Sequence, residues 1–203
     1  MKQAVSSIAT ALGLDDLRPG RHILRDAKRM RTGELTVTDA WFAHIIPSFH
    51  DRGVVAVVRA EDTEFRGNVT PGFLRAAVAV VSIETEALRQ TVVADIDNDP
   101  LPTALQSLDL LATSDSLWLD GIGYELHTHT RACRSTIQFS NPSIDCFRAI
   151  ESAIFDVANT VATTSRDQTI AGFVNTWNDY LKDSGRVTES FYDTAVAMPF
   201  DFE

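Results

Sequence analysis

The chain has 203 residues, of which 44% are hydrophobic and 23% charged, and this composition is typical of a folded domain and not of a disordered chain. Its 18 Lys and Arg against 28 Asp and Glu give a net charge of −10, which argues against general nucleic-acid binding. Two cysteines cannot form a disulfide scaffold, and no apolar stretch reaches the roughly 18 residues of a membrane span.

The ends of the chain bear on location and on domain organisation. Residues 1–14 contain three hydroxyl side chains within their apolar stretch, so they are typical of an amphipathic helix and not of an export signal. We therefore expect a cytoplasmic protein without a membrane partner. No repeat or long linker interrupts the chain, which predicts a single domain over 1–203 with a loosely packed tail at 187–203.

A basic segment stands near the start of this acidic chain. Helical spacing over 21–31 places apolar residues on one face and basic residues on the other, which predicts a short basic amphipathic helix. Its outward basic residues are candidates for contact with an acidic partner. They are Arg21, Arg25, Lys28 and Arg29. Pairing of this segment with the acidic region 90–130 of the same chain is the alternative.

The middle of the chain predicts both helices and strands. Thr38 and Asp39 are suited to cap a helix over 41–46 that Pro47 would end. The β-branched run 54–58 predicts a strand buried on both faces.

The next stretch, 70–96, is ambiguous. Thr70 and Pro71 favour a helix start, whereas the valine-rich runs 77–83 and 91–96 are typical of strands. We expect a helix from Pro71 that gives way to a strand near Thr91. Leucines at helical spacing then predict a short helix over 101–111.

The region 118–139 alternates apolar and polar residues and therefore predicts a β-hairpin. A loop of two residues would pair Leu126 with Ile137, whereas a loop of four residues, 131–134, would pair it with Phe139. The turn has no Gly or Asn for a tight primed turn, so we favour the longer loop.

Two amphipathic helices should follow the hairpin. In the first, capped by Ser143, an apolar stripe over 147–161 should lie across the apolar face of the hairpin. The second is bracketed by Asp167 and Gly185. Its predicted inner face is Ile170, Phe173, Val174, Trp177 and Leu181. These elements predict an α+β fold, in which an antiparallel sheet containing the hairpin is packed by C-terminal amphipathic helices.

One strand of the hairpin carries the clearest candidate for chemistry. Alternation places Glu125, His127 and His129 on the face opposite Tyr124 and Leu126. Two imidazoles and a carboxylate suit Zn²⁺ or Fe²⁺, so these three are the candidate metal ligands. The alternative is a polar strand face with no ligand, and apart from such a divalent metal we expect no cofactor.

A second candidate is the adjacent pair His50 and Asp51. Together with His22 upstream and Asp95 downstream, they supply the ligand types of HD-type phosphohydrolases. Those enzymes are helical at this point, whereas here a strand follows directly, so the agreement in spacing is better explained as coincidence. The acidic run 95–99 lacks the Gly and the final acid of a calcium loop and is better explained as a turn or a helix cap.

No catalytic motif stands out, while the uneven charge suits a binding surface. The sequence therefore favours a non-enzymatic binding or accessory protein that acts through contact with another macromolecule, either a protein partner or a second copy of the chain. The alternative hypothesis is a metal-dependent hydrolase, phosphoesterase-like, that uses a His/Asp/Glu site.

Overall fold

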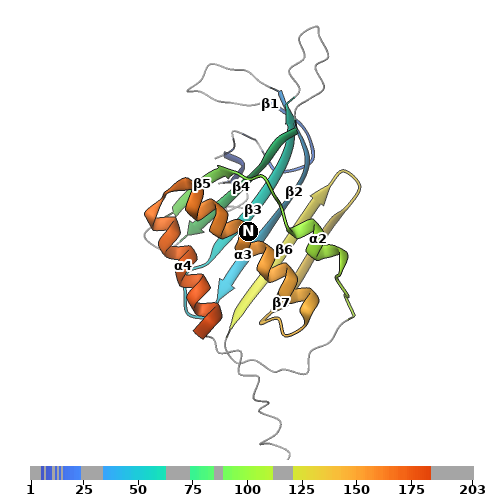
Figure 1. Cartoon of the computed structure of the whole chain (residues 1–203). Helices are drawn as coiled ribbons and strands as arrows, with labels where there is room; N and C mark the ends of the chain where they lie inside the picture. Colours follow the sequence, from blue (N-terminus) through green and yellow to red (C-terminus); the bar gives the residue numbers. More distant parts are fainter. Residues whose placement is uncertain are drawn as a thin grey trace, which may run out of the picture.

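A computed structural model of the chain, shown in Figure 1, describes residues 6, 8–10, 12, 14, 16–23, 34–62, 74–84, 89–111 and 121–183. The described strands are β1 (Gly20–Ile23), β2 (Glu34–Pro47), β3 (Gly53–Asp62), β4 (Leu74–Glu84), β5 (Arg89–Asp95), β6 (Ile122–Thr130) and β7 (Arg134–Ser140). The described helices are α2 (Leu101–Gln106), α3 (Asp145–Ser165) and α4 (Gln168–Asp183).

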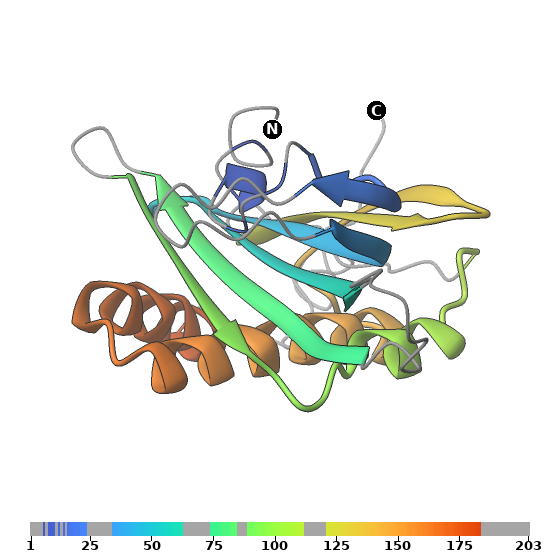
Figure 2. The same cartoon turned by 90° about the horizontal axis from the view of Figure 1, so that it is seen from above.

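The described strands form one antiparallel sheet in the order β5-β4-β3-β2-β6-β7, and β1 pairs with the start of β2. Helices α3 and α4 lie on one face of this sheet, and the N-terminal residues lie on the other, as Figure 2 shows. The fold is therefore α+β, with an antiparallel sheet packed by C-terminal amphipathic helices, as the sequence predicts.

Strand β3 confirms the expected strand that is buried on both faces. Val55 and Val57 pack in the core beneath the helices, whereas Val54, Ala56 and Val58 pack in a second core on the opposite face. Successive side chains of a strand point to opposite faces, so a run without polar residues fits only a strand covered on both sides.

Strand β2 corrects the helix expected over 41–46. Trp41 and Ile45 point to the helix-covered face, whereas Phe42 points to the second core. A short apolar run buried on both faces has no period that distinguishes a strand from a buried helix. Pro47 stands at the end of the strand, where a missing amide hydrogen is tolerated.

The predicted helix from Pro71 is also wrong over its described part. Residues 74–84 form β4, which pairs with β3 and β5, as the valine-rich alternative indicated. The strand expected near Thr91 is confirmed as β5. The short helix expected over 101–111 is confirmed only over Leu101–Gln106, as α2, because residues 107–111 are not helical.

The predicted basic helix over 21–31 is wrong at its start, because 20–23 form β1. Arg21 therefore lies on a strand that pairs with β2. The other three candidate partner-binding residues, Arg25, Lys28 and Arg29, lie outside the described residues, as does the tail 187–203.

The hairpin of β6 and β7 is confirmed, but its register is that of the shorter loop. Leu126 pairs with Ile137, and the chain turns between Thr130 and Cys133. The Thr130 hydroxyl accepts hydrogen bonds from the backbone amides of Ala132 (3.3 Å) and Cys133 (2.9 Å). This side-chain turn takes the place of the Gly or Asn that a primed turn would need.

The apolar stripe of α3 packs over the sheet as predicted and extends further than the hairpin. The helix contacts β3, β4 and β5 as well as α2 and α4. The N-cap residue of α3 is Ile144 and not the expected Ser143. Asp167 caps α4 through the amide of Ile170 at 3.0 Å, as predicted.

Candidate functional site

The predicted metal ligands lie on the sheet face opposite α3, as alternation requires. His127 is only 7% exposed, and both of its ring nitrogens have partners. Its Nε2 lies 2.7 Å from Glu125 Oε1, and its Nδ1 lies 3.0 Å from Thr136 Oγ1. The imidazole also stacks on Phe42, with ring centroids 4.6 Å apart. These contacts are sufficient to explain a buried histidine at this position.

The third predicted ligand, His129, lies beyond His127 along β6, on the side away from Glu125. Four residues of strand separate it from Glu125, a distance of about 13 Å between Cα atoms. Burial lowers the pKa of His129, and the nearby Arg134 lowers it further. In the part of the chain that the structure describes, no three His, Cys, Asp or Glu side chains are arranged to hold a metal ion. The metal site stays a prediction.

His44 is a member of this histidine cluster that the sequence did not reveal. It lies on β2 directly opposite Glu125, and its ring centroid is 6.3 Å from that of His127. Its Nε2 is buried without a hydrogen-bond partner among the described residues, and burial lowers its pKa. The cross-strand neighbours of His44 could be found only once β2 was known to be a strand and its register was set.

The structure does not bring together the four residues with phosphohydrolase ligand types. His22 pairs with Leu35 near the start of β2, whereas His50 follows the end of that strand. Twelve residues of strand between Leu35 and Pro47 span about 40 Å. Strand pairing places the Arg89 end of β5 on the same side of the sheet as the start of β3, which follows His50. Asp95 lies at the opposite end of β5 and is therefore far from His50.

The acidic run 95–99 serves the fold, in agreement with its interpretation as a turn, whereas the N-cap residue of α2 is Pro100. Asp99 Oδ1 accepts a hydrogen bond from the amide of Leu101 at the start of α2 (3.1 Å). Its Oδ2 accepts one from Trp41 Nε1 (3.0 Å) and pairs with Arg59 Nη2 (3.0 Å). This carboxylate therefore ties α2 to the central strands of the sheet.

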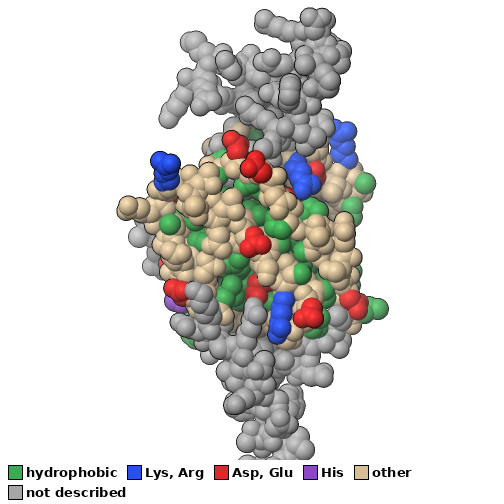
Figure 3. Space-filling view, in the orientation of Figure 1, with side chains coloured by type: hydrophobic (Ala, Val, Ile, Leu, Met, Phe, Trp, Pro, Cys, Tyr) green, Lys and Arg blue, Asp and Glu red, His purple; other side chains and the backbone are tan. Residues whose placement is uncertain are grey.

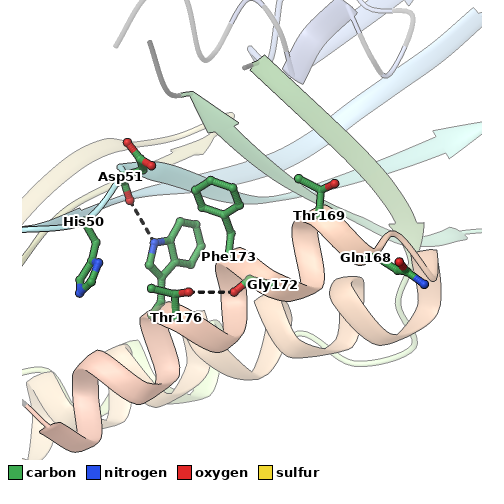
Figure 4. A pocket seen from close by; sticks show the side chains of 8 residues that line it. His50, Asp51, Gln168, Thr169, Gly172, Phe173 and Thr176 are labelled. Carbon is green, nitrogen blue, oxygen red and sulfur yellow. Dashed lines mark hydrogen bonds between the residues drawn. The ribbon is translucent and has the colours of Figure 1, made fainter. Parts of the chain in front are cut away.

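The loop between β2 and β3 forms an open groove against α4, shown in Figure 4, with a volume of about 320 Å³. We name it the α4 groove. It is lined by His50, Asp51, Gln168, Thr169, Gly172, Phe173, Thr176 and Trp177. The indole of Trp177 donates a hydrogen bond to the Asp51 carbonyl oxygen (3.1 Å), which joins the loop to the helix. The groove thus contains the His50–Asp51 pair that the sequence singles out.

Three polar side chains of the α4 groove are those of His50, Asp51 and Thr176. Figure 4 shows the imidazole of His50 and the carboxylate of Asp51 pointing in different directions. The hydroxyl of Thr176 donates to the Gly172 carbonyl oxygen one turn earlier in the helix (3.0 Å).

A large apolar side chain directly precedes the groove residue His50 in the β2–β3 loop. This residue, Phe49, is 72% exposed. The other strongly exposed apolar side chains of the described residues, Leu110 and Leu111, follow α2 at a separate place in the chain.

Comparison of the chain with models of protein families, with curated proteins and with solved structures finds no match. None of the helices in the described ranges has the length and hydropathy that a membrane crossing requires.

Proposed function

We propose that this protein is a non-enzymatic binding protein of the cytoplasm, and that a protein partner docks on Phe49 and the α4 groove. The observation that carries the proposal is the exposure of Phe49, which directly precedes the groove residue His50 in the chain, together with the partly exposed Phe173 in the lining of the α4 groove. Aromatic side chains contribute a large part of the binding energy at protein interfaces.

The shape of the α4 groove favours a macromolecule over a small metabolite. Pockets for small molecules bury most of the ligand surface and range from roughly 300 to 1,000 Å³. This groove is at the low end of that range, and Gln168, Thr169, Gly172 and Thr176 on its rim are exposed. It therefore suits one or two side chains that project from a larger partner.

The charge of the chain indicates the chemistry of the partner. The net charge of −10 attracts a basic protein and repels nucleic acid. Over the face that carries α3 and α4, charged side chains of both signs are scattered and not gathered into one patch (Figure 3). We therefore expect long-range attraction to assist docking, and binding to weaken as salt concentration rises.

The test is selection of a random peptide display library on the immobilised full chain and on two variants. We expect the selected peptides to carry an aromatic or large aliphatic residue and to lose binding about tenfold or more on Phe49→Ser, because that substitution removes a buried contact at the interface. Leu111→Ser is the matched control. Leu111 is 88% exposed, so this variant also loses an exposed apolar side chain but leaves the groove intact.

Peptides that bind Phe49→Ser as well as the unmodified chain would contradict the proposal. So would peptides that lose binding equally on both variants, since that result would indicate general hydrophobic adhesion and not docking at this loop.

A further inference from the structure

The sheet ends at β7 without the features that usually protect an edge strand. In the described sheet β7 pairs with β6 on one side, and no described strand pairs with its other side. The strand contains no proline, its register with β6 has no bulge, and its inward-facing side chains carry no charge. An edge of this kind is a template for pairing with another strand.

The backbone groups on this edge can be assigned from the hairpin hydrogen bonds. The amide of Thr130 bonds to the Cys133 carbonyl oxygen (2.8 Å), and the amide of Asn141 bonds to that of Ile122 (3.0 Å). Hydrogen-bonded and non-hydrogen-bonded pairs alternate between antiparallel strands. The backbone N–H and C=O groups that point away from β6 therefore belong to Arg134, Thr136, Gln138 and Ser140, and all four residues are exposed.

The helix-covered side of the same edge is apolar and incompletely buried. Ile137, Phe139 and Phe147 pack against the main core but stay partly exposed, because the sheet stops at β7. The rings of Phe139 and Phe147 are 5.3 Å apart, so strand and helix present one continuous apolar border. A further strand beside β7 would cover it.

We infer that the occupant of this edge is β7 of a second copy of the chain, paired antiparallel about a twofold axis at Ile137. In this register Ile137 faces its own copy, Thr136 faces Gln138, and Arg134 faces Ser140. The backbone groups that point away from β6 then oppose one another. The pairs of Thr136 with Gln138 and of Arg134 with Ser140 therefore each exchange two backbone hydrogen bonds. The two seven-strand sheets join into one.

The charge on β7 favours a second copy over a basic partner strand. Arg134 is the single charged residue of β7, and the strand contains no Asp or Glu although the chain carries −10. In the twofold register the two copies of Arg134 lie about 20 Å apart, well beyond the Debye length in physiological salt. No like charges therefore oppose each other across the strand pair.

The whole chains still repel each other at long range, because each carries −10. Salt screens this repulsion, so we expect the dimer to become stronger as salt concentration rises. This dependence is opposite in sign to the one expected for partner binding at the α4 groove. The failure of one account is therefore distinguishable from the failure of the other.

The first experiment is sedimentation equilibrium of the full chain and of two variants at position 138. Gln138→Pro removes an outward amide hydrogen and leaves the bonds to β6 intact, because edge positions that face solvent tolerate proline. We expect a concentration-dependent dimer for the unmodified chain and for Gln138→Ala, and dimerisation about tenfold or more weaker for Gln138→Pro. Circular dichroism checks that both variants fold.

The second experiment tests the register by disulfide formation in a Cys133→Ser, Cys146→Ser background. Ile137→Cys places two thiols on the twofold axis, where Cα atoms about 4.5 Å apart lie within the range that disulfides span. We expect this variant to oxidise to a covalent dimer. Ser140→Cys is the control and should stay monomeric, because its two copies would lie about 20 Å apart along the strands.

Three outcomes would overturn the inference. The first is an unmodified chain that stays monomeric at about 100 µM in high salt, where a micromolar Kd would populate the dimer. The second is a dimer that Gln138→Pro leaves unchanged, which would place the contact on another surface. The third is covalent dimer formation by Ser140→Cys and not by Ile137→Cys.

Discussion

The imidazole of His44 lies among residues of its own strand, β2, and of the neighbouring strand β6. Phe42 and Glu125 lie close to its imidazole, and Nε2 is buried without a partner among the described residues. Burial disfavours the charged imidazolium, so the pKa of His44 lies below its ordinary value of 6.5. The same cause lowers the pKa of His129 on the neighbouring strand. Both rings are therefore suited to the neutral form.

These two histidines predict a loss of stability in mild acid. Their pKa values are lowered in the folded chain, so the unfolded chain binds more protons below about pH 6.5 and the free energy of unfolding falls as pH drops through that range. His44→Leu should reduce this slope and raise stability near pH 7 by about 1 kcal/mol, because it removes an unpartnered buried nitrogen. Urea unfolding between pH 5 and 8 measures both the pH slope and the stability near pH 7. The free energy of unfolding should fall by roughly 1–3 kcal/mol per molar urea.

The control for this prediction is Thr103→Leu, at an exposed position in α2 that carries no titratable group. It should leave the pH slope unchanged. A slope that is the same in His44→Leu as in the unmodified chain would contradict the assignment.

At the scale of elements, some local patterns indicate the structure more clearly than others. The run 54–58 predicts its strand correctly, because four of its five residues are valine, a β-branched residue typical of strands. The run 41–46 is also mostly apolar, but it contains His44, and a nearby capping residue and Pro47 favoured a helix. Local signals of this kind are overridden when long-range pairing with β3 and β6 supplies the hydrogen bonds.

The candidate site shows the same limit of sequence information. Alternation predicts that Glu125 and His127 share a face, and the structure places them in contact. That His44 joins them depends on the register between β2 and β6, which no local pattern specifies. The contact between the His50–Asp51 loop and α4 is likewise a tertiary one, since Trp177 follows Asp51 by 126 residues.

Asp99 provides the test at this scale. Asp99→Ala removes the acceptor for Trp41 Nε1 and the partner of Arg59, so we expect it to lower the free energy of unfolding by about 2–3 kcal/mol. Trp41 should become more accessible to an added quencher. Asp97→Ala, at an exposed position in the same loop, should change stability by no more than about 0.5 kcal/mol. Equal effects of the two variants would contradict the anchoring role of Asp99.

At the scale of the whole molecule, we propose two surfaces for contact with other proteins. The β7 edge suits a second copy, whereas Phe49 and the α4 groove suit a different partner. They lie on separate elements, β7 on one side and the β2–β3 loop with α4 on the other. Both can therefore be occupied at once.

The metal content of the chain tests the competing hypothesis of a metal-dependent hydrolase. We expect tag-free protein, purified without chelator, to contain metal well below one ion per chain, because both ring nitrogens of His127 already have partners. Elemental analysis measures this, with a His127→Ala, His129→Ala double variant as the comparison. Near-stoichiometric metal that disappears in the double variant would support the hydrolase instead.

The most direct test of the proposed function is to fill the α4 groove without harming the fold. A Cβ atom at Gly172 would meet no other atom within 4 Å, and Gly172 lies within α4. Gly172→Leu should therefore raise the stability of the helix by about 1 kcal/mol while its side chain occupies the groove. Calorimetric titration with a peptide selected on the unmodified chain should then show binding weaker by about tenfold or more, with a higher Tm. Unchanged affinity in this more stable variant would contradict the account.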